Sequence, residues 1–440
     1  MKKTMGLIAM IILCIGIIVG CSSGNSNESN ANAKENNGEA KNNENSNESV
    51  SLKMAVFPDD KETFESVYED FKKDHPNIDI TFESFPQQQY YEKIRMQLSS
   101  GDGYDLFTGQ MDQMIDTGLL ASLDDLIKES GLDVSGFGTM YDTYKHEDEV
   151  KSLPYRKSNT LLYYNKTLFD EKGVEHPTDD MTWDEFRELA KKMTSGSGEN
   201  KVYGAYIQQW PQLWYMSAVQ EGATIIDKDL TPFKDALQFR LDLEKDGSIM
   251  GWSEQVTTGA HYNAAFQKGN VAMSIIGDWH VAQLREAETA GDIDFDWDVV
   301  PVPHPEGIAK NTTTALPVTV MMNNNTKHPK EAFEFLKYAT GKEGAVQFAS
   351  NGYLTGYMDE DVEKAYLGDG SQKPENLHYF LEAKEYPEYP MLQGVKNVVV
   401  GQIFTQEGEL ALIGEQTVDE AIDKISERVQ KEWASKYEGK

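Results

Sequence analysis

Cysteine is almost absent from this chain of 440 residues, because its two cysteines, Cys14 and Cys21, both lie near the N-terminus. The rest of the chain therefore cannot form a disulfide, a cysteine-ligated zinc site or a thiol nucleophile. Basic residues are also scarce: 41 Lys and Arg stand against 73 Asp and Glu, for a formal net charge of −32. We expect no nucleic-acid partner, since phosphate binding needs a basic face.

Motifs of common cofactor and catalytic sites are missing as well. The chain contains no G-x-x-x-x-G-K-[ST], no G-x-G-x-x-G and no H-E-x-x-H. The acidic segment from Asp292 to Asp298 has Trp297 where a calcium loop needs glycine, so we predict a strand with its carboxylates on one face instead. The sequence thus indicates no metal, no cofactor and no enzyme. Paired carboxylates keep a secreted glycoside hydrolase as an alternative.

The N-terminus predicts export and lipid attachment. Lys2 and Lys3 precede an uncharged, mostly apolar run that is too short to span a membrane, so residues 1–20 are predicted to be a signal peptide. The run ends in Ile18-Val19-Gly20-Cys21, which resembles a bacterial lipobox and indicates lipidation at Cys21. An ordinary signal peptide with an incidental cysteine is the alternative. Residues 21–50 are rich in Asn and Ser and are predicted to be a disordered tether beside a membrane.

The body of the chain alternates between the two hydrophobic periods. Apolar residues repeat every second position over 52–56 and 78–82 and at helical spacing over 64–71, which predicts a βαβ unit. Tyr90 to Leu98 is predicted to be a helix, and 104–107 a short buried strand. Such alternation predicts an α/β fold with mostly parallel sheet.

Two sequence signals predict helix starts. Thr182-Trp183-Asp184-Glu185 and Thr417-Val418-Asp419-Glu420 each match a capping box before an amphipathic helix. Further helices are predicted over 331–339 and within 266–283, the latter broken by a strand over 271–276.

Aromatic residues stand beside polar ones at Tyr155-Arg156, at Trp210 to Tyr215 and at Gly277-Asp278-Trp279-His280. Aromatic rings can stack on the C–H faces of a sugar while Asp, Gln and Arg bind its hydroxyls. These segments therefore favour a neutral, hydroxyl-rich ligand, although any single Trp could equally belong to the core.

With these segments the chain resembles the sugar-binding, maltose-binding-protein-like members of the extracellular solute-binding proteins of ABC importers. The resemblance extends over about residues 50–435. The blocks that carry it, in order, are Gly103-Tyr104-Asp105-Leu106-Phe107, Leu153-Pro154-Tyr155, Leu162 to Lys166, Thr182 to Phe186, Phe266 to Met273, Gly277-Asp278-Trp279, Lys330 to Leu336 and Thr417 to Trp433.

The resemblance implies a type II periplasmic-binding-protein fold, with two α/β lobes, crossing segments between them and a ligand cleft. Residues 51–156 with 310–354 are expected to form lobe 1, and residues 157–309 with 355–440 lobe 2. Closure of the lobes would present a loaded protein to the permease subunits of an ABC transporter.

The resemblance also suggests the ligand-binding residues, with Trp279 as the strongest candidate. Some candidates lie at the carboxyl ends of predicted strands, where α/β sheets bind ligands. The candidates are Asp59, Gln88, Gln110, Asp112, Arg156, Gln209, Trp210, Trp214, Asp278 and Trp279.

We therefore predict a monomeric, non-enzymatic lipoprotein outside the cytoplasm, anchored to a bacterial cell membrane. The lipobox and the Asn- and Ser-rich tether of the protein suggest a Gram-positive bacterium. Its ligand is expected to be a neutral oligosaccharide, since the negative charge would repel an anion. Arg156 leaves an acidic sugar open. The alternatives are the same fold with another solute such as a peptide or polyol, a secreted glycoside hydrolase, and a surface adhesin or lectin.

Overall fold

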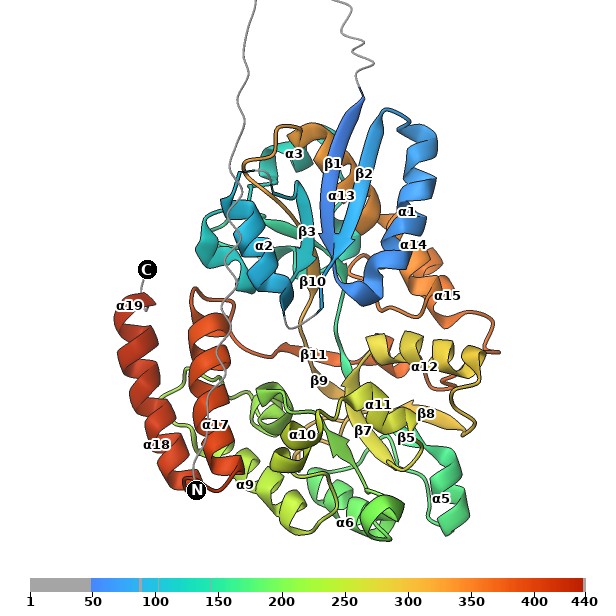
Figure 1. Ribbon diagram of the computed structural model, residues 1–440, viewed down its shortest axis with the longest axis vertical. Helices are drawn as coiled ribbons and strands as arrows, with labels where there is room; N and C mark the ends of the chain where they lie inside the picture. Colours follow the sequence, from blue (N-terminus) through green and yellow to red (C-terminus); the bar gives the residue numbers. More distant parts are fainter. Residues whose placement is uncertain (1–48, 87–88, 102, 144, 438–440) are drawn as a thin grey trace, which may run out of the picture. The chain divides into compact units, whose positions relative to one another are not determined.

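The computed structural model describes residues 49–86, 89–101, 103–143 and 145–437, whose strands form two larger sheets and one strand pair (Figure 1). The predicted signal peptide, Cys21, the tether up to residue 48 and Gln88 lie outside the described residues. None of the described helices is both long enough and apolar enough to cross a membrane.

The first sheet has the strand order β2-β1-β3-β10-β4. Its members are β1 (Val50–Val56), β2 (Ile78–Ser84), β3 (Leu106–Gly109), β4 (Ser152–Arg156) and β10 (Val318–Met322). β1 pairs in parallel with β2 and β3, and α1 (Lys61–Asp74) connects β1 to β2, so the predicted βαβ unit is confirmed. The helix ends just before His75-Pro76, because a residue that precedes proline avoids the helical region.

Helices from both halves of the chain cover the first sheet. They are α1, α2 (Tyr90–Ser99), α3 (Asp124–Ser130), α4 (Met140–Thr143), α13 (Pro329–Thr340) and α14 (Lys342–Ser350). Phe71 of α1 meets Phe335 of α13 edge to face, with ring centroids 5.2 Å apart, inside one hydrophobic core. The helices predicted over 90–98 and 331–339 are confirmed as α2 and α13.

The second sheet has the order β6-β7-β5-β8 and draws its strands from the middle of the chain. They are β5 (Thr160–Asn165), β6 (Tyr206–Ile207), β7 (Met273–Gly277) and β8 (Trp297–Val300). A separate pair joins β9 (Thr312–Ala315) to β11 (Lys384–Pro387), which lies between the two larger sheets in Figure 1.

The prediction of mostly parallel sheet is wrong. β10 runs antiparallel to β3 and β4, and β5 runs antiparallel to β7 and β8. β5 follows a strand of the other sheet after only three residues, so no crossover helix joins it to its neighbours and no parallel direction is imposed.

The other α- and π-helices pack around the second sheet and in the C-terminal region. They are α5 (Lys166–Lys172), α6 (Trp183–Met193), α7 (Pro211–Trp214), α8 (Met216–Gln220), α9 (Thr231–Lys245), α10 (Trp252–Thr258), α11 (Tyr262–Gln267), α12 (Trp279–Ala290), α15 (Glu360–Leu367), α16 (Tyr379–Glu382), the π-helix η7 (Val395–Phe404), α17 (Thr405–Leu412), α18 (Val418–Arg428), the π-helix η8 (Val429–Ala434) and α19 (Ser435–Tyr437). Both predicted capping boxes are confirmed, at the starts of α6 and α18.

Three short segments carry the chain from one sheet to the other, and they lie side by side. The segment after β4 bonds to the segment before α15, where the Lys157 backbone N–H donates to the Leu354 carbonyl oxygen. It also meets the segment before β10, where the Leu316 N–H donates to the Ser158 carbonyl. The chain thus crosses between its two sheets near residues 157–159, 315–317 and 354–356.

Candidate ligand-binding site

A group of charged side chains lies where the crossing segments leave the first sheet. We call Asp59, Asp60, Arg156, Asp278 and Tyr353 the first cluster. The Arg156 Nη2 atom lies 3.3 Å from a carboxylate oxygen of Asp60, and the guanidinium stands over the Tyr353 ring, 5.2 Å from its centroid. The Nε and Nη1 atoms of Arg156 are buried without a hydrogen-bond partner among the described residues.

Asp278 reaches the first cluster from the second sheet. It directly precedes α12, and one of its carboxylate oxygens accepts the Leu354 backbone N–H at 3.0 Å, while the other is buried and unpartnered. Burial raises the pKa of Asp278 to about 7, although Arg156 opposes this shift. Burial likewise raises the pKa of Asp60, against the attraction of Arg156. Acids and a cation from both sheets therefore share one buried position.

Three aromatic side chains stand next to this cluster. The Trp279 indole N–H donates to the Tyr262 hydroxyl at 2.9 Å, and Trp210 contacts both rings at centroid distances of 5.6 Å and 6.0 Å. Trp279 is only partly buried and packs against the hydrophobic cores of both sheets. A Cβ atom at Gly277 would lie 2.0 Å from the Trp279 ring, so glycine at this position is what lets the indole lie there.

Two polar side chains of α12, His280 and Gln283, connect the second sheet to Asp59 of the first cluster through hydrogen bonds. The Gln283 side-chain amide donates to the Asp59 carboxylate at 3.3 Å, and its oxygen lies 3.2 Å from Nδ1 of His280. His280 is fully buried among Tyr163, Tyr262 and Phe266, and this burial lowers its pKa to about 3. The neutral imidazole donates from Nδ1, which orients the Gln283 amide toward Asp59.

A second charged group gathers beyond the end of β3. We call Asp112, Glu388, Tyr389, Tyr215 and Lys396 the second cluster. Asp112 follows β3 and Glu388 follows β11, and these carboxylate side chains are only 6% and 8% exposed. Burial raises the pKa of Asp112 and raises that of Glu388 to about 7. The Lys396 ammonium stands 4.8 Å from the centroid of the Tyr389 ring.

The predicted site residues distribute unevenly between these features. Asp59, Arg156 and Asp278 lie in the first cluster, Trp210 and Trp279 beside it, and Asp112 in the second cluster. The Gln110 backbone N–H donates to the Tyr91 hydroxyl at 2.9 Å. The charges of both Asp112 and Arg156 affect the pKa of Tyr91, so Gln110 lies near both clusters. Gln209 directly precedes Trp210 and is partly exposed.

Trp214 occupies a different environment. Its ring is 6% exposed and stacks on Phe404 of η7, with centroids 6.0 Å apart, within the core of the C-terminal helices. The structure thus gives it the packing role that is the ordinary one for a tryptophan between apolar helices. Gln88 lies outside the described residues.

Sequence reasoning missed Tyr262, Gln283, Glu388 and Tyr389. Glu388 stands in the segment Tyr386-Pro387-Glu388-Tyr389-Pro390, whose prolines predict a turn, and nothing local marks the carboxylate as buried. Glu388 follows β11, which pairs with β9, a strand about 70 residues earlier in the chain, and such a long-range pairing leaves no local signal.

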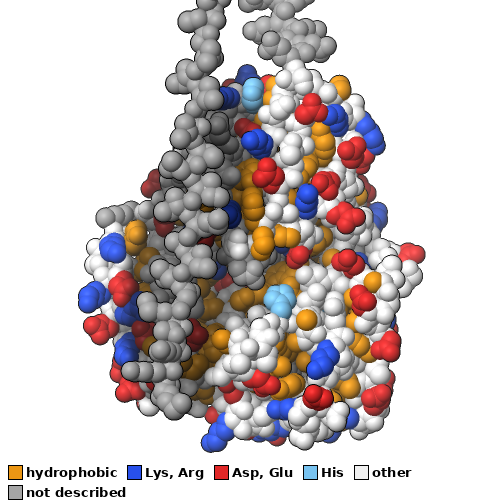
Figure 2. Space-filling view, viewed as in Figure 1, with side chains coloured by type: hydrophobic (Ala, Val, Ile, Leu, Met, Phe, Trp, Pro, Cys, Tyr) orange, Lys and Arg blue, Asp and Glu red, His pale blue; other side chains and the backbone are white. Residues whose placement is uncertain are grey.

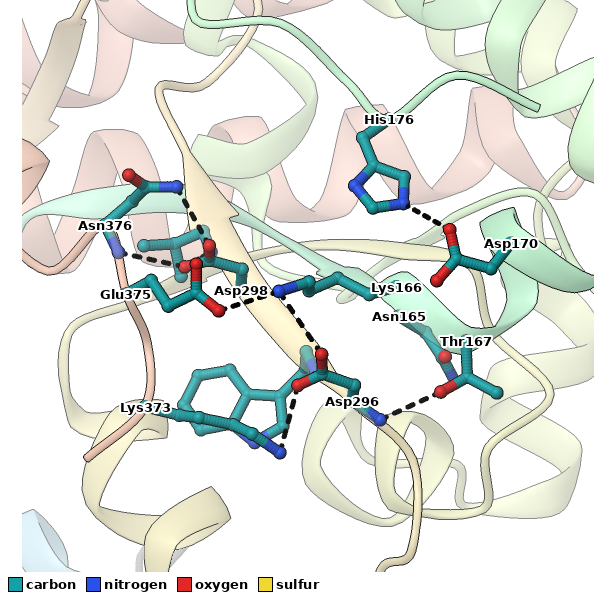
Figure 3. A network of polar contacts seen from close by, with 12 residues as sticks. Asn165, Lys166, Thr167, Asp170, His176, Asp296, Asp298, Lys373, Glu375 and Asn376 are labelled. Atoms are coloured by element: carbon teal, nitrogen blue, oxygen red, sulfur yellow. Dashed lines mark hydrogen bonds and ion pairs between the residues drawn. The ribbon is translucent and has the colours of Figure 1, made fainter. Parts of the chain in front are cut away.

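The acidic segment 292–298 holds no free cluster of carboxylates. Asp296 lies between the ammonium groups of Lys166 and Lys373, at 3.2 Å and 3.0 Å, and the Asp298 carboxylate accepts the Asn376 side-chain amide at 2.8 Å (Figure 3). The expected strand is short, because β8 begins only at Trp297, and Asp298 is buried rather than on an open face. Within the described residues, no group of three or more His, Cys, Asp or Glu could hold a metal ion.

Hydrophobic side chains also gather on the surface between the two sheets, as Figure 2 shows midway down the molecule in the same view as Figure 1. Rings, amides and partly unpaired charges that converge from two lobes suit a polar ligand with apolar faces. Two α/β lobes with three crossing segments between them define the class of two-lobed solute-binding proteins.

A model of the bacterial extracellular solute-binding protein family matches residues 55–346, and the chain belongs to this family. The multiple sugar-binding protein of Streptococcus mutans is 22% identical over 77% of this chain and 78% of its own length. The sn-glycerol-3-phosphate-binding periplasmic protein of Agrobacterium fabrum is 26% identical over 71% of this chain and 74% of its own length.

The fold is shared with solved structures. A sugar transporter protein of Rhizobium etli, crystallised in an open conformation, superposes with a TM-score of 0.73 at 27% identity, covering 87% of this chain and 99% of that one. The resemblance inferred from the sequence and the predicted type II periplasmic-binding-protein fold are therefore confirmed.

Proposed function

We propose that this protein is the substrate-binding component of an ABC importer for an oligosaccharide without anionic groups. The observation that carries this proposal is the meeting of Trp210, Tyr262 and Trp279 with the first cluster, between the two sheets. Aromatic faces can stack on sugar rings while the Asp59 carboxylate and the free guanidinium nitrogens of Arg156 bind hydroxyls. A sugar-binding relative and a sugar-transporter structure support the same ligand class.

The charge of the two clusters argues against an anionic ligand. Together they contain five carboxylates, against one arginine and one lysine. A phosphate or uronic acid entering this region would either meet ionised carboxylates at low dielectric or force the buried carboxyls to keep their protons, and both effects oppose its binding. The glycerol-phosphate-binding relative therefore favours the fold more than the ligand.

Lobe closure would turn binding into a signal. We propose lobe 1 as residues 51–156 with 310–354, and lobe 2 as residues 157–309 with 355–440, with the ligand between them and the closed form delivered to membrane permease subunits. No enzymatic step belongs to this function. Closure by a ligand that contacts both lobes is a shift between two states, driven by its better fit to the closed one.

Attachment to the membrane is part of the proposal. A lipid on Cys21, after removal of residues 1–20, would hold a monomeric protein on the outer face of a bacterial cell membrane. Incorporation of radiolabelled palmitate in a lipoprotein-processing host should be lost in Cys21→Ala and kept in Cys14→Ala. Equal labelling of the two variants would refute the anchor and leave the binding function untouched.

The test of the ligand class is a thermal-shift and tryptophan-fluorescence screen against neutral, amino and acidic mono- and oligosaccharides. A sugar at about 100 times its dissociation constant should stabilise the fold by about 2.7 kcal/mol. Trp279→Ala should weaken binding of that sugar at least about tenfold, equal to about 1.4 kcal/mol. Trp183→Ala is the matched control, since this indole bonds to Gln220 away from both clusters.

The outcomes separate clearly. Stabilisation by acidic sugars alone would overturn the charge argument. If no sugar changes the melting temperature or the fluorescence, the carbohydrate assignment fails and a peptide or polyol ligand takes its place.

A further inference from the structure

The second cluster brings two buried carboxylates together from distant parts of the chain. Asp112 belongs to the short helix Met111–Gln113 that follows β3, and that helix contacts η7 of the C-terminal region. Glu388 follows β11, and the charge of Asp112 reaches it strongly enough to add to the rise in its pKa. The pair thus spans both lobes of the proposed binding protein.

Three of the four carboxylate oxygens of this pair are buried and lack partners among the described residues. Both carboxylate oxygens of Asp112, Oε2 of Glu388 and the hydroxyl groups of Tyr215 and Tyr389 are buried with no hydrogen-bond partner among the described residues. The Tyr389 hydroxyl faces Asp112 and Tyr215 faces Glu388, without reaching hydrogen-bonding geometry. A buried polar atom without a partner is destabilising, and more so when it is charged, so this arrangement calls for a ligand that brings hydrogen-bond donors.

Charge decides which donor fits. Lys396 is the cation of this cluster, and its charge lowers the pKa values of Asp112 and Glu388. Among the described residues no ion pair within 4.0 Å involves Lys396, so neither carboxylate is neutralised by direct contact. A hydroxyl group would satisfy one oxygen and leave the buried negative charge in place. An ammonium group brings three hydrogen-bond donors and one positive charge. These fit the unpartnered oxygens and the negative charge of two carboxylates, because Lys396 compensates that charge only from a distance.

We propose that the second cluster is an ammonium-binding subsite, and that the captured oligosaccharide carries a free amino group held between the Asp112 and Glu388 carboxylates. This proposal rests on the proposed function, which only requires that the ligand has no anionic group. The ligand class becomes an amino-sugar oligosaccharide, with its rings against the aromatic residues beside the first cluster.

Proton release is a second consequence of this subsite. Burial raises the pKa of Glu388 to about 7, so this carboxyl is partly protonated near neutral pH in the free protein. Burial also raises the pKa of Asp112, and an arriving cation favours the charged forms of both groups. The titratable groups that face the subsite are Asp112, Glu388, Lys396 and the hydroxyls of Tyr91, Tyr215 and Tyr389. An amine should therefore displace protons on binding, and its affinity should rise from pH 5 to pH 7.

The experiment compares sugars that differ in one group. Isothermal titration at pH 6.5 uses glucose, glucosamine and N-acetylglucosamine, which carry a hydroxyl, an amine and an uncharged amide at the same position. The corresponding mannose and galactose sets and the β-1,4-linked dimers of the glucose set are titrated in the same way. At least one amine should bind tenfold or more tightly than its two counterparts. Its binding enthalpy should vary with the ionisation enthalpy of the buffer, as proton release requires.

Two variants connect the preference to the pair. Glu388→Gln should remove most of the tenfold preference for the amine while affinity for the neutral counterpart changes less than threefold. Glu382→Gln, an exposed glutamate on neighbouring α16, is the control and should keep the preference. Should Glu388→Gln fold poorly, the buffer dependence in the unmodified protein still tests the proposal.

Each result is decisive. A neutral sugar that binds as tightly as its amine, with binding that still depends on Trp279, overturns the ammonium subsite and leaves the proposed function standing. Absence of binding by every sugar in the set overturns both.

Discussion

Individual buried acids decide how this fold responds to pH. Asp278 is buried at the start of α12, where burial raises its pKa from 3.8 to about 7. A carboxyl group that keeps its proton in the fold stabilises the fold at low pH, and that contribution is lost as the pH rises through the folded-state value. Asp278→Asn should therefore melt with the wild type near pH 4 and at a higher temperature at pH 8.

The difference in melting temperature should grow between about pH 4 and pH 7, the window set by the two pKa values. Asp246→Asn is the control with the opposite sign. Arg187 donates to the Asp246 carboxylate at 2.6 Å and lowers the pKa of Asp246, so its loss should destabilise at pH 7 and cease to matter in strong acid. A gain for Asp278→Asn that shrinks as the pH rises would refute the assigned burial effect.

Single residues also mark the limit of sequence reasoning about the site. Trp279 and Asp278 sit in a compact block, Gly277-Asp278-Trp279, whose glycine makes room for the indole, so a short motif was enough to mark them as candidates. Trp214 shares the same kind of local context but faces Phe404, nearly 200 residues further along the chain. Which face a tryptophan presents depends on a distant partner, and the sequence around it does not record that partner.

At the scale of single elements, α18 offers a clean test of helix capping. The Thr417 hydroxyl accepts the Glu420 backbone N–H at 3.2 Å, and the Glu420 carboxylate accepts the Thr417 N–H at 2.8 Å. Thr417→Ala removes one half of this box and should lower the free energy of unfolding by about 1 kcal/mol. Chemical denaturation measures this loss.

Sugar affinity should not change in Thr417→Ala, because the cap belongs to neither cluster. Thr289→Ala is the matched control and should cost less, because Thr289 is exposed in the last turn of α12 and its hydroxyl donates to the Arg285 carbonyl of the same helix. Equal losses in the two variants would show that the cap contributes nothing beyond an ordinary surface hydroxyl.

Elements whose signals are local could be predicted, and those set by distant pairing could not. A capping box depends on four consecutive residues, and the start of α18 follows from them. The direction of β5 depends on β7 and β8, which lie more than 100 residues away. The alternation of strand and helix therefore predicted the fold class correctly and the parallel sheets wrongly.

For the whole molecule, the ordered blocks of the sequence were enough to indicate a two-lobed binding protein. They could not indicate the meeting of Asp112 with Glu388 or of Gln283 with Asp59, because each pair joins segments more than 200 residues apart. Contacts between lobes arise only when both lobes have folded and approached. The contacts between the lobes are consequently the hardest to predict from a sequence.

Two contacts of the same chemistry join the two proposed lobes. Gln283 donates its amide to Asp59 at 3.3 Å, and Asn397 donates its amide to Asp116 at 3.5 Å. Both are exposed and long, so each contributes little alone, and together they bias the lobes toward closure without locking them. Replacing both amides, Gln283→Ala with Asn397→Ala, should shift the unliganded protein toward an open state.

Single-molecule fluorescence transfer between cysteines introduced at Asp125 of α3 and Thr257 of α10 measures this shift, once Cys14 and Cys21 are replaced by serine. The double variant should show less of the high-transfer population and a weaker apparent affinity by the same factor, because only the competent fraction binds. Gln238→Ala is the control, since its amide also donates to an aspartate, Asp242 at 2.9 Å, but within one helix. If the double variant and the control behave alike, closure is governed by the crossing segments and the ligand alone.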